Sequence, residues 1–111
     1  MRLVRLDSVP EEGVSHDPEL RKRVLLRRGE VPHLTALSRA VLRPGQAATP
    51  HAHADMHEVF WVAAGRGEAR VAGATLALEP GVCLVVEPGE EHTVACTGGD
   101  ALVLLYLGIE G

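Results

Sequence analysis

The sequence predicts an all-β fold, a sandwich or barrel of antiparallel strands, from its turn residues and from the length of its apolar runs. Turn residues rich in Gly and Pro recur at short intervals from residue 44 onward. The apolar runs between them are rich in Val and Leu and too short for packed helices. Evenly spaced short runs of this kind are typical of antiparallel sandwiches and barrels. The turns are Pro44-Gly45, Gly65-Arg66-Gly67, Ala72-Gly73, Glu79-Pro80-Gly81, Glu87-Pro88-Gly89 and Gly98-Gly99-Asp100.

Seven segments between these turns are expected to form strands. Their β-branched and apolar residues suit a pleated, half-buried surface. The turn at Ala72-Gly73 is typical of a hairpin tip. The expected strands are Leu34 to Leu42, Val59 to Ala64, Glu68 to Val71, Thr75 to Leu78, Val82 to Val86, Thr93 to Cys96 and Ala101 to Leu107.

The first thirty residues support two alternatives. Asp17 and Pro18 could begin one helical turn that continues to Arg21. The apolar run from Val24 to Leu26 could form an edge strand.

Length and composition limit the kinds of protein that the chain can be. With 111 residues, 46% apolar and 23% charged, it has the composition of one globular domain. Its net charge of −4 and its lack of an extended basic patch argue against nucleic acid as a partner. No apolar stretch is long enough for a signal peptide or a membrane span, so we expect a cytoplasmic protein with no membrane partner. Cys83 and Cys96 are then expected to be reduced.

Histidines are concentrated in one short segment, Pro50 to Glu58, which holds three of the six. Residues two apart on a strand project from one face, so His51 and His53 can direct both imidazoles at one point. Glu58 lies at an odd offset from His53, so the chain must bend between them for all three to share a site. His92 follows a distant turn and would supply a fourth ligand from another hairpin. Three imidazoles and one carboxylate suit one divalent transition metal ion, which we expect to be iron, manganese, nickel or zinc.

The same segment resembles the first motif of the cupin family. Gly45, His51-x-His53, Glu58 and Gly65 match that motif at every position. The second motif is recognisable in Gly81 and in the run Gly89-Glu90-Glu91-His92. Two positions depart from the family pattern: Glu87 stands where a proline is usual, and Cys96 where an asparagine is frequent. Neither position is normally a metal ligand.

The resemblance to small single-domain cupins, of the type-2 conserved barrel kind, implies a double-stranded β-helix, or jelly-roll, barrel. The barrel would take up residues 1–111 as one domain, with a motif-bearing core at 34–107 and an N-terminal arm at 1–33. The resemblance also implies a metal-dependent enzyme that acts on a small organic molecule, as a dioxygenase, decarboxylase or isomerase. One alternative is a non-catalytic module that binds a metal and a small ligand. Another is a metal-free sugar-nucleotide epimerase, which uses a His base with a carboxylate partner.

Strand alternation predicts which side chains near the site face the interior. If Glu58 faces inward, Phe60 and Val62 do so as well and are candidates to line the pocket. Cys96, four residues after His92, shares its strand face and either lines the pocket or is a small core residue.

The same alternation predicts an apolar outer face. His57 then points outward, together with Val59, Trp61 and Ala63. Such a face usually marks a partner, so we expect a homodimer. The remaining polar candidates are expected to lie on the surface or in packing positions: His16, His33 and the solvated turn formed by Glu87, Glu90 and Glu91.

Overall fold

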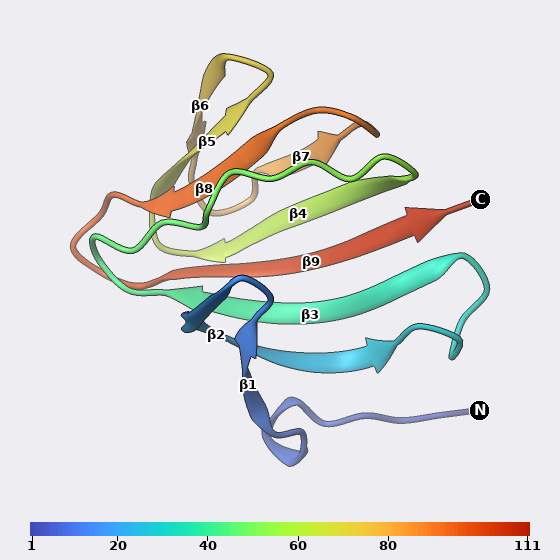
Figure 1. Ribbon diagram of the computed structural model, residues 1–111. Helices are drawn as coiled ribbons and strands as arrows, with labels where there is room; N and C mark the ends of the chain where they lie inside the picture. Colours follow the sequence, from blue (N-terminus) through green and yellow to red (C-terminus); the bar gives the residue numbers. More distant parts are fainter.

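The computed structural model describes all of residues 1–111 and contains nine strands and one short 3-10 helix (Figure 1). No helix in it is long and apolar enough to cross a membrane. The strands are β1 (Glu11–Val14), β2 (Asp17–Arg27), β3 (Leu34–Leu42), β4 (Met56–Ala64), β5 (Gly67–Val71), β6 (Ala74–Leu78), β7 (Cys83–Val86), β8 (His92–Cys96) and β9 (Leu102–Glu110). The helix, η1, spans Leu6–Ser8.

The strands form two antiparallel sheets. The larger has six strands in the order β1-β2-β3-β9-β4-β7, and the smaller has three in the order β6-β5-β8 (Figure 1). A cluster of thirteen buried apolar side chains, drawn from both sheets, fills the space between them. The fold is therefore the all-β jelly-roll barrel that the sequence predicts.

All seven predicted strands are present, with ends that differ from the prediction by at most three residues. β3 has the predicted bounds, whereas β4 begins three residues earlier, at Met56, and β9 ends three residues later, at Glu110. These two extensions pair with each other, Met56 opposite Glu110, through backbone bonds that need no apolar side chains. The hairpin tip is also as predicted, because Ala72 and Gly73 both have the positive φ that a tight hairpin turn requires.

The N-terminal residues form a hairpin of β1 and β2, and the helical turn considered for Asp17 is absent. Asp17 is instead the first residue of β2, and its carboxylate accepts two hydrogen bonds from Thr49, so it is not free to cap a helix. The run from Val24 to Leu26 does lie in a strand, but β2 is second from the edge because β1 covers it. This hairpin extends the wall of the barrel, since β2 pairs with β3 from Arg21 to Arg27.

Side chains along β4 alternate between the buried and the exposed face in the phase that the sequence predicts. Glu58, Phe60 and Val62 are buried, with 7%, 6% and 1% of their surface exposed. Trp61 is 44% exposed on the opposite side of the sheet. The strand thus presents one polar ligand and two apolar residues to the barrel interior.

The connection between β3 and β4, residues 43–55, runs along the edge of the smaller sheet. The Ala48 amide donates to the Val94 carbonyl at 2.9 Å, and isolated bridges join Ala47 with Ala95 and His51 with His92. The connection therefore lies beside β8 as an irregular additional strand. Its last part crosses from the smaller sheet to β4 in the larger one, directly over the open end of the barrel.

Candidate metal centre

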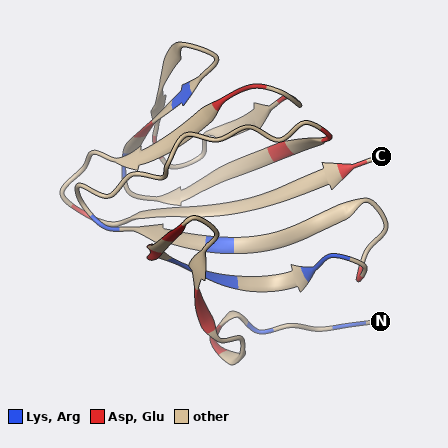
Figure 2. Ribbon diagram, viewed as in Figure 1, with Lys and Arg blue, Asp and Glu red and all other residues tan.

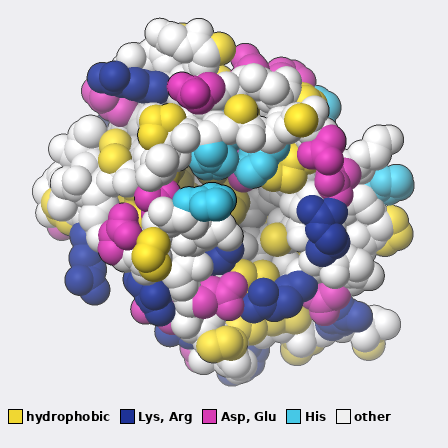
Figure 3. All heavy atoms as spheres, viewed as in Figure 1, with side chains coloured by type: hydrophobic (Ala, Val, Ile, Leu, Met, Phe, Trp, Pro, Cys, Tyr) yellow, Lys and Arg dark blue, Asp and Glu magenta, His cyan; other side chains and the backbone are white.

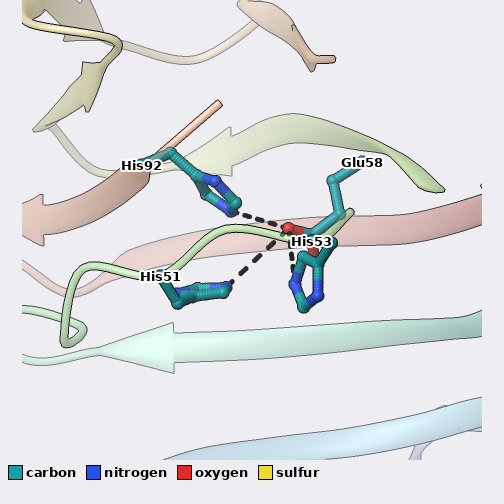
Figure 4. A group of neighbouring side chains, drawn as sticks. All are labelled: His51, His53, Glu58 and His92. Carbon is teal, nitrogen blue, oxygen red and sulfur yellow. Dashed lines mark hydrogen bonds and ion pairs between the residues drawn. The ribbon is translucent and has the colours of Figure 1, made fainter. Parts of the chain in front are cut away.

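Four side chains from three parts of the chain meet at this end of the barrel (Figure 4). His51 and His53 lie on the connection between β3 and β4, Glu58 lies in β4, and His92 is the first residue of β8. The larger sheet therefore supplies the carboxylate, the smaller sheet one imidazole, and the segment that joins them the other two.

The donor atoms of the four side chains are close enough to hold one ion. All lie within 4.8 Å of one another. The Nε2 atoms of His92, His53 and His51 lie 2.7, 3.5 and 3.9 Å from the same oxygen, Glu58 Oε1. The structure thus brings together all four ligands that the sequence predicts.

Hydrogen bonds at the far side of two rings set their orientation. His51 Nδ1 lies 3.0 Å from the Thr49 carbonyl, and His92 Nδ1 lies 3.0 Å from the Glu90 carbonyl. A carbonyl only accepts, so each Nδ1 carries the proton and donates it. The Nε2 lone pair of each neutral ring then faces the cluster, which is the tautomer a metal ligand needs.

The local backbone differs from the predicted strand-borne pair. His51 makes a single bridge to His92, with reciprocal backbone hydrogen bonds of 3.0 and 2.9 Å, and His53 belongs to no strand. His53 is held by its carbonyl, which accepts the Gly89 amide at 2.7 Å. The required bend is present at Ala54 and Asp55. It allows His53 and Glu58 to face the same site although an odd number of positions separates them.

Asp17 and Thr49 support the site, and sequence reasoning missed both. The buried Asp17 carboxylate accepts the Thr49 amide at 2.9 Å and the Thr49 hydroxyl at 2.7 Å. These hydrogen bonds hold the pKa of Asp17 below its usual value, with the larger effect from the Thr49 hydroxyl, and they outweigh the opposing effect of burial. Since the Thr49 carbonyl in turn orients His51, the start of β2 anchors a ligand 34 positions away. A contact between such distant positions leaves no periodic signal in the sequence.

Three of the four residues, His51, His53 and Glu58, line a cavity of about 610 Å³, whereas His92 lines a smaller pocket next to it together with His51 and Glu58. In Figure 3 the histidines gather beside a hollow in this face of the molecule, with cationic side chains around it. Phe60, one of the predicted lining residues, does not line this cavity; it lines the smaller pocket of about 80 Å³, where it stacks on Tyr106 with ring centroids 5.7 Å apart. Val62 and Cys96 are instead packed in the apolar core, away from the cavity lining, and the Cys96 thiol donates to the Asp100 carbonyl at 3.2 Å. Cys83 and Cys96 are both free thiols, as predicted.

Tyr106 was not among the predicted lining residues, although it occupies the inner wall opposite Ser38. Burial raises the pKa of Tyr106 to about 12. The Ser38 hydroxyl lies close to the Tyr106 phenol and acts to lower this pKa, but it makes no hydrogen bond of good geometry. Tyr106 is therefore a neutral phenol that can donate a hydrogen bond into the cavity.

The remaining histidines lie outside the cluster. His57 points away from the barrel, as predicted, and its Nε2 is 2.7 Å from the exposed carboxylate of Glu87. His33 is a turn residue whose carbonyl accepts the Glu110 amide. His16 is exposed in the turn between β1 and β2, where it borders the cavity.

The chemistry of the donor set fits a divalent transition ion. Two of the three imidazoles, those of His51 and His92, present an unprotonated Nε2 to the site. The Glu58 carboxylate and His92 are buried, so water competes poorly for them. An ion that prefers six ligands would keep two further positions for other ligands if these four residues held it.

A sequence model of the cupin domain matches residues 38–108, well over half of the chain. The protein belongs to the cupin family. The matched residues include all four residues of the candidate metal site of this cupin. A comparison with curated proteins gives no match.

Solved structures agree with the cupin fold along the whole chain. A predicted oxalate decarboxylase from Thermotoga maritima superposes with a TM-score of 0.91 at 22% identity, covering 99% of this chain and 100% of that one. KdgF from a Halomonas species gives 0.82 at 19% identity, covering 100% and 96%. The polyketide cyclase RemF from Streptomyces resistomycificus gives 0.82 at 23% identity, covering 98% and 79%. At these identities the comparisons show the fold alone.

The pKa of His92 predicts how the cupin site responds to pH. Burial alone lowers this pKa, but the hydrogen bonds to Glu58 and to the Glu90 carbonyl, together with the two negative charges, outweigh it, and the pKa is raised above 6.5. In the metal-free protein the ion pair with Glu58 therefore stabilises the fold below about pH 6.5, and that contribution is lost as pH rises through the raised pKa. Metal binding needs the neutral ring and has the opposite dependence.

We therefore expect the difference in unfolding free energy between zinc-loaded and metal-free protein to grow from pH 5.5 to 8. The slope should approach roughly 1.4 kcal/mol per pH unit for each proton that the ion displaces. Urea unfolding with zinc and with a chelator, at each pH, measures it. His57→Gln, which changes an exposed histidine, should keep the slope, whereas a difference independent of pH would contradict this assignment.

Proposed function

We propose that this cupin is a metal-dependent enzyme that acts on a small organic molecule. The observation that carries the proposal is the convergence of His51, His53, Glu58 and His92 on one point at the wall of a cavity of about 610 Å³. Such a volume is within the range of small-molecule sites. One divalent ion, iron, manganese, nickel or zinc, would be held by these four residues.

A bound ion would supply Lewis acidity toward a carbonyl or carboxylate oxygen, or, if redox-active, chemistry with dioxygen. Side chains of the protein would orient the substrate. Phe60 and Tyr106 stack on each other next to the ligands, with the Phe60 ring centroid 6.1 Å from that of His92. Tyr106 keeps its proton at physiological pH and offers it as a hydrogen-bond donor.

Three reaction classes fit these features: dioxygenation, decarboxylation and isomerisation. Two structures with the same fold carry names of small-molecule enzymes, a predicted oxalate decarboxylase and a polyketide cyclase, which supports the substrate size. The free thiols support a reducing compartment, and we place the protein in the cytoplasm.

A test of enzymatic activity uses protein loaded separately with each of the four metals. Each form is incubated with a panel of small carboxylic and oxo acids, in air and without oxygen, and products are followed by mass spectrometry. We expect at least one form to turn over a panel member, and Glu58→Gln to lower the rate at least a hundredfold. Glu87→Gln is the matched control, because Glu87 is exposed and pairs with His57 outside the cavity.

The outcome that contradicts enzymatic function is tight binding without turnover. Metal-loaded protein that binds a panel member and converts none would indicate the non-catalytic alternative, a module that binds a metal and a small ligand. Equal rates in Glu58→Gln and wild type would place any observed activity outside this site.

We also propose that the chain acts as a homodimer through the outer face of the larger sheet. This face, defined by Val59, Trp61, Val85, Leu105, Leu107 and Ile109, is apolar across β7, β4 and β9. Trp61, Val85 and Ile109 are each more than 40% exposed, and Figure 2 shows no Lys or Arg on β4 or β9. An uncharged apolar face is complementary to a second copy of itself, as a two-fold interface requires.

Sedimentation velocity at micromolar concentration tests the dimer. We expect the mass of two chains for wild type and of one chain for Trp61→Glu and for Val85→Glu, because each places a carboxylate in the interface. Leu76→Glu, at an exposed apolar residue of β6 in the other sheet, should remain dimeric. A monomeric wild type would rule out this assembly.

A further inference from the structure

We infer that Lys22, which lines the same cavity as His51, His53 and Glu58, binds a carboxylate of the substrate, and that the substrate is therefore an organic acid. This inference rests on the proposed function, because it concerns the same cavity. Its basis is the position of one cation that the fold does not use.

Lys22 is the only lysine of the chain, and it faces the barrel interior. On β2 it alternates with Leu20 and Val24, both buried, and it pairs with Ala40, which belongs to the apolar core. An apolar residue would suit this position for packing alone. Lys22 is instead half-buried, and it lines the same cavity as His51, His53 and Glu58.

The carboxylates around Lys22 are engaged by other cations. Glu12, directly opposite across the β1–β2 pair, binds Arg27 at 2.9 Å, and this hydrogen bond, with smaller effects of the charges of Arg27, Lys22 and Arg21, holds the pKa of Glu12 below its usual value. Glu110, at the cavity rim, pairs with Arg28. The Lys22 ammonium makes no ion pair and no hydrogen bond with the protein. A half-buried cation without a partner favours an anion from outside the chain.

A second observation points to a ligand in the same place. The Ser38 hydroxyl, on the neighbouring strand β3, is only 1% exposed and lines the cavity; it lies close to the Tyr106 phenol but makes no hydrogen bond of good geometry. Buried polar atoms are nearly always paired, so an orphan facing a cavity indicates a missing partner. Tyr106, opposite Ser38 on β9, adds a phenol that stays protonated. Lys22, Ser38 and Tyr106 together offer an ammonium and two hydroxyls, which suit the oxygens of a carboxylate.

These donors and the metal ligands define the two ends of the substrate. One end has oxygen atoms that reach the ion, and the other has a carboxylate that contacts Lys22. The simplest molecules of this class are compact dicarboxylic acids and oxo or hydroxy acids. The cavity volume of about 610 Å³ admits them.

Titration calorimetry with paired probes tests the role of Lys22. Zinc-loaded protein is titrated with malonate, succinate and glutarate, and with the monoamide of each, which keeps the shape but lacks the second charge. We expect at least one diacid to bind ten or more times more tightly than its monoamide. Lys22→Met, and separately Lys22→Gln, should weaken that diacid at least tenfold and remove the preference.

Arg21→Met is the matched control, since it removes the same charge from the adjacent residue, which binds Glu11 on the other side of the strand. It should keep the preference for the diacid. Equal binding of diacid and monoamide by wild type, no binding of any diacid, or an unchanged preference in the Lys22 variants would overturn the inference.

Zinc content, measured on every sample, separates this inference from the proposed function. If wild type takes up zinc but shows no preference, the carboxylate site is wrong and the metal site stands. If wild type takes up neither zinc nor iron, manganese or nickel, the proposed function fails, and the same titration on metal-free protein decides on Lys22. A preference that Lys22→Met removes would support the carboxylate site, and equal binding would overturn it.

Discussion

The contact between Glu58 and His92 joins the two sheets at the open end of the barrel, and the rest of the site is built around it. Glu58 comes from β4 in the larger sheet and His92 from β8 in the smaller one, with 2.7 Å between carboxylate oxygen and Nε2. Both residues are buried, so an unpaired carboxylate or imidazolium here would cost several kcal/mol. A proton or a metal ion between them satisfies both. Because the two sheets are fixed relative to each other by the core, this point of the fold has a defined geometry for an ion.

The barrel interior is divided along its length into an apolar part and a polar part. Leu20, Leu102 and Leu104 belong to the packed part, which holds the sheets together. Beyond it the inward residues of β2, β3 and β9 are Lys22, Ser38 and Tyr106, which line the same cavity as His51, His53 and Glu58. Each polar position interrupts an otherwise apolar alternation and weakens packing there. The packed apolar part of the interior holds the two sheets together despite this weaker packing. The fold can therefore keep a cavity with several polar groups of differing chemistry.

Much of the fold and the central part of the site could be predicted from the sequence, because both depend on local patterns. The turns and short apolar runs predict seven strands, and the offsets among His51, His53 and Glu58 predict a bend that the structure has at Ala54 and Asp55. Other features depend on contacts between distant positions. Asp17 binds Thr49 across the barrel instead of capping a helix, and the inward direction of Lys22 follows from its register with Ala40. Val62 has the predicted inward phase, yet it lies in the core and not at the cavity, because phase alone does not fix depth along the barrel.

Metal content measured by elemental mass spectrometry, on protein purified without an affinity tag, tests the central claim most directly. The account predicts about one iron, manganese, nickel or zinc ion per chain in wild type and its loss in a His51→Ala, His53→Ala double variant. The variant should remain folded, because both side chains lie on the irregular connection outside the core. Absence of metal from wild type even after anaerobic reconstitution, or equal metal in the variant, would contradict it.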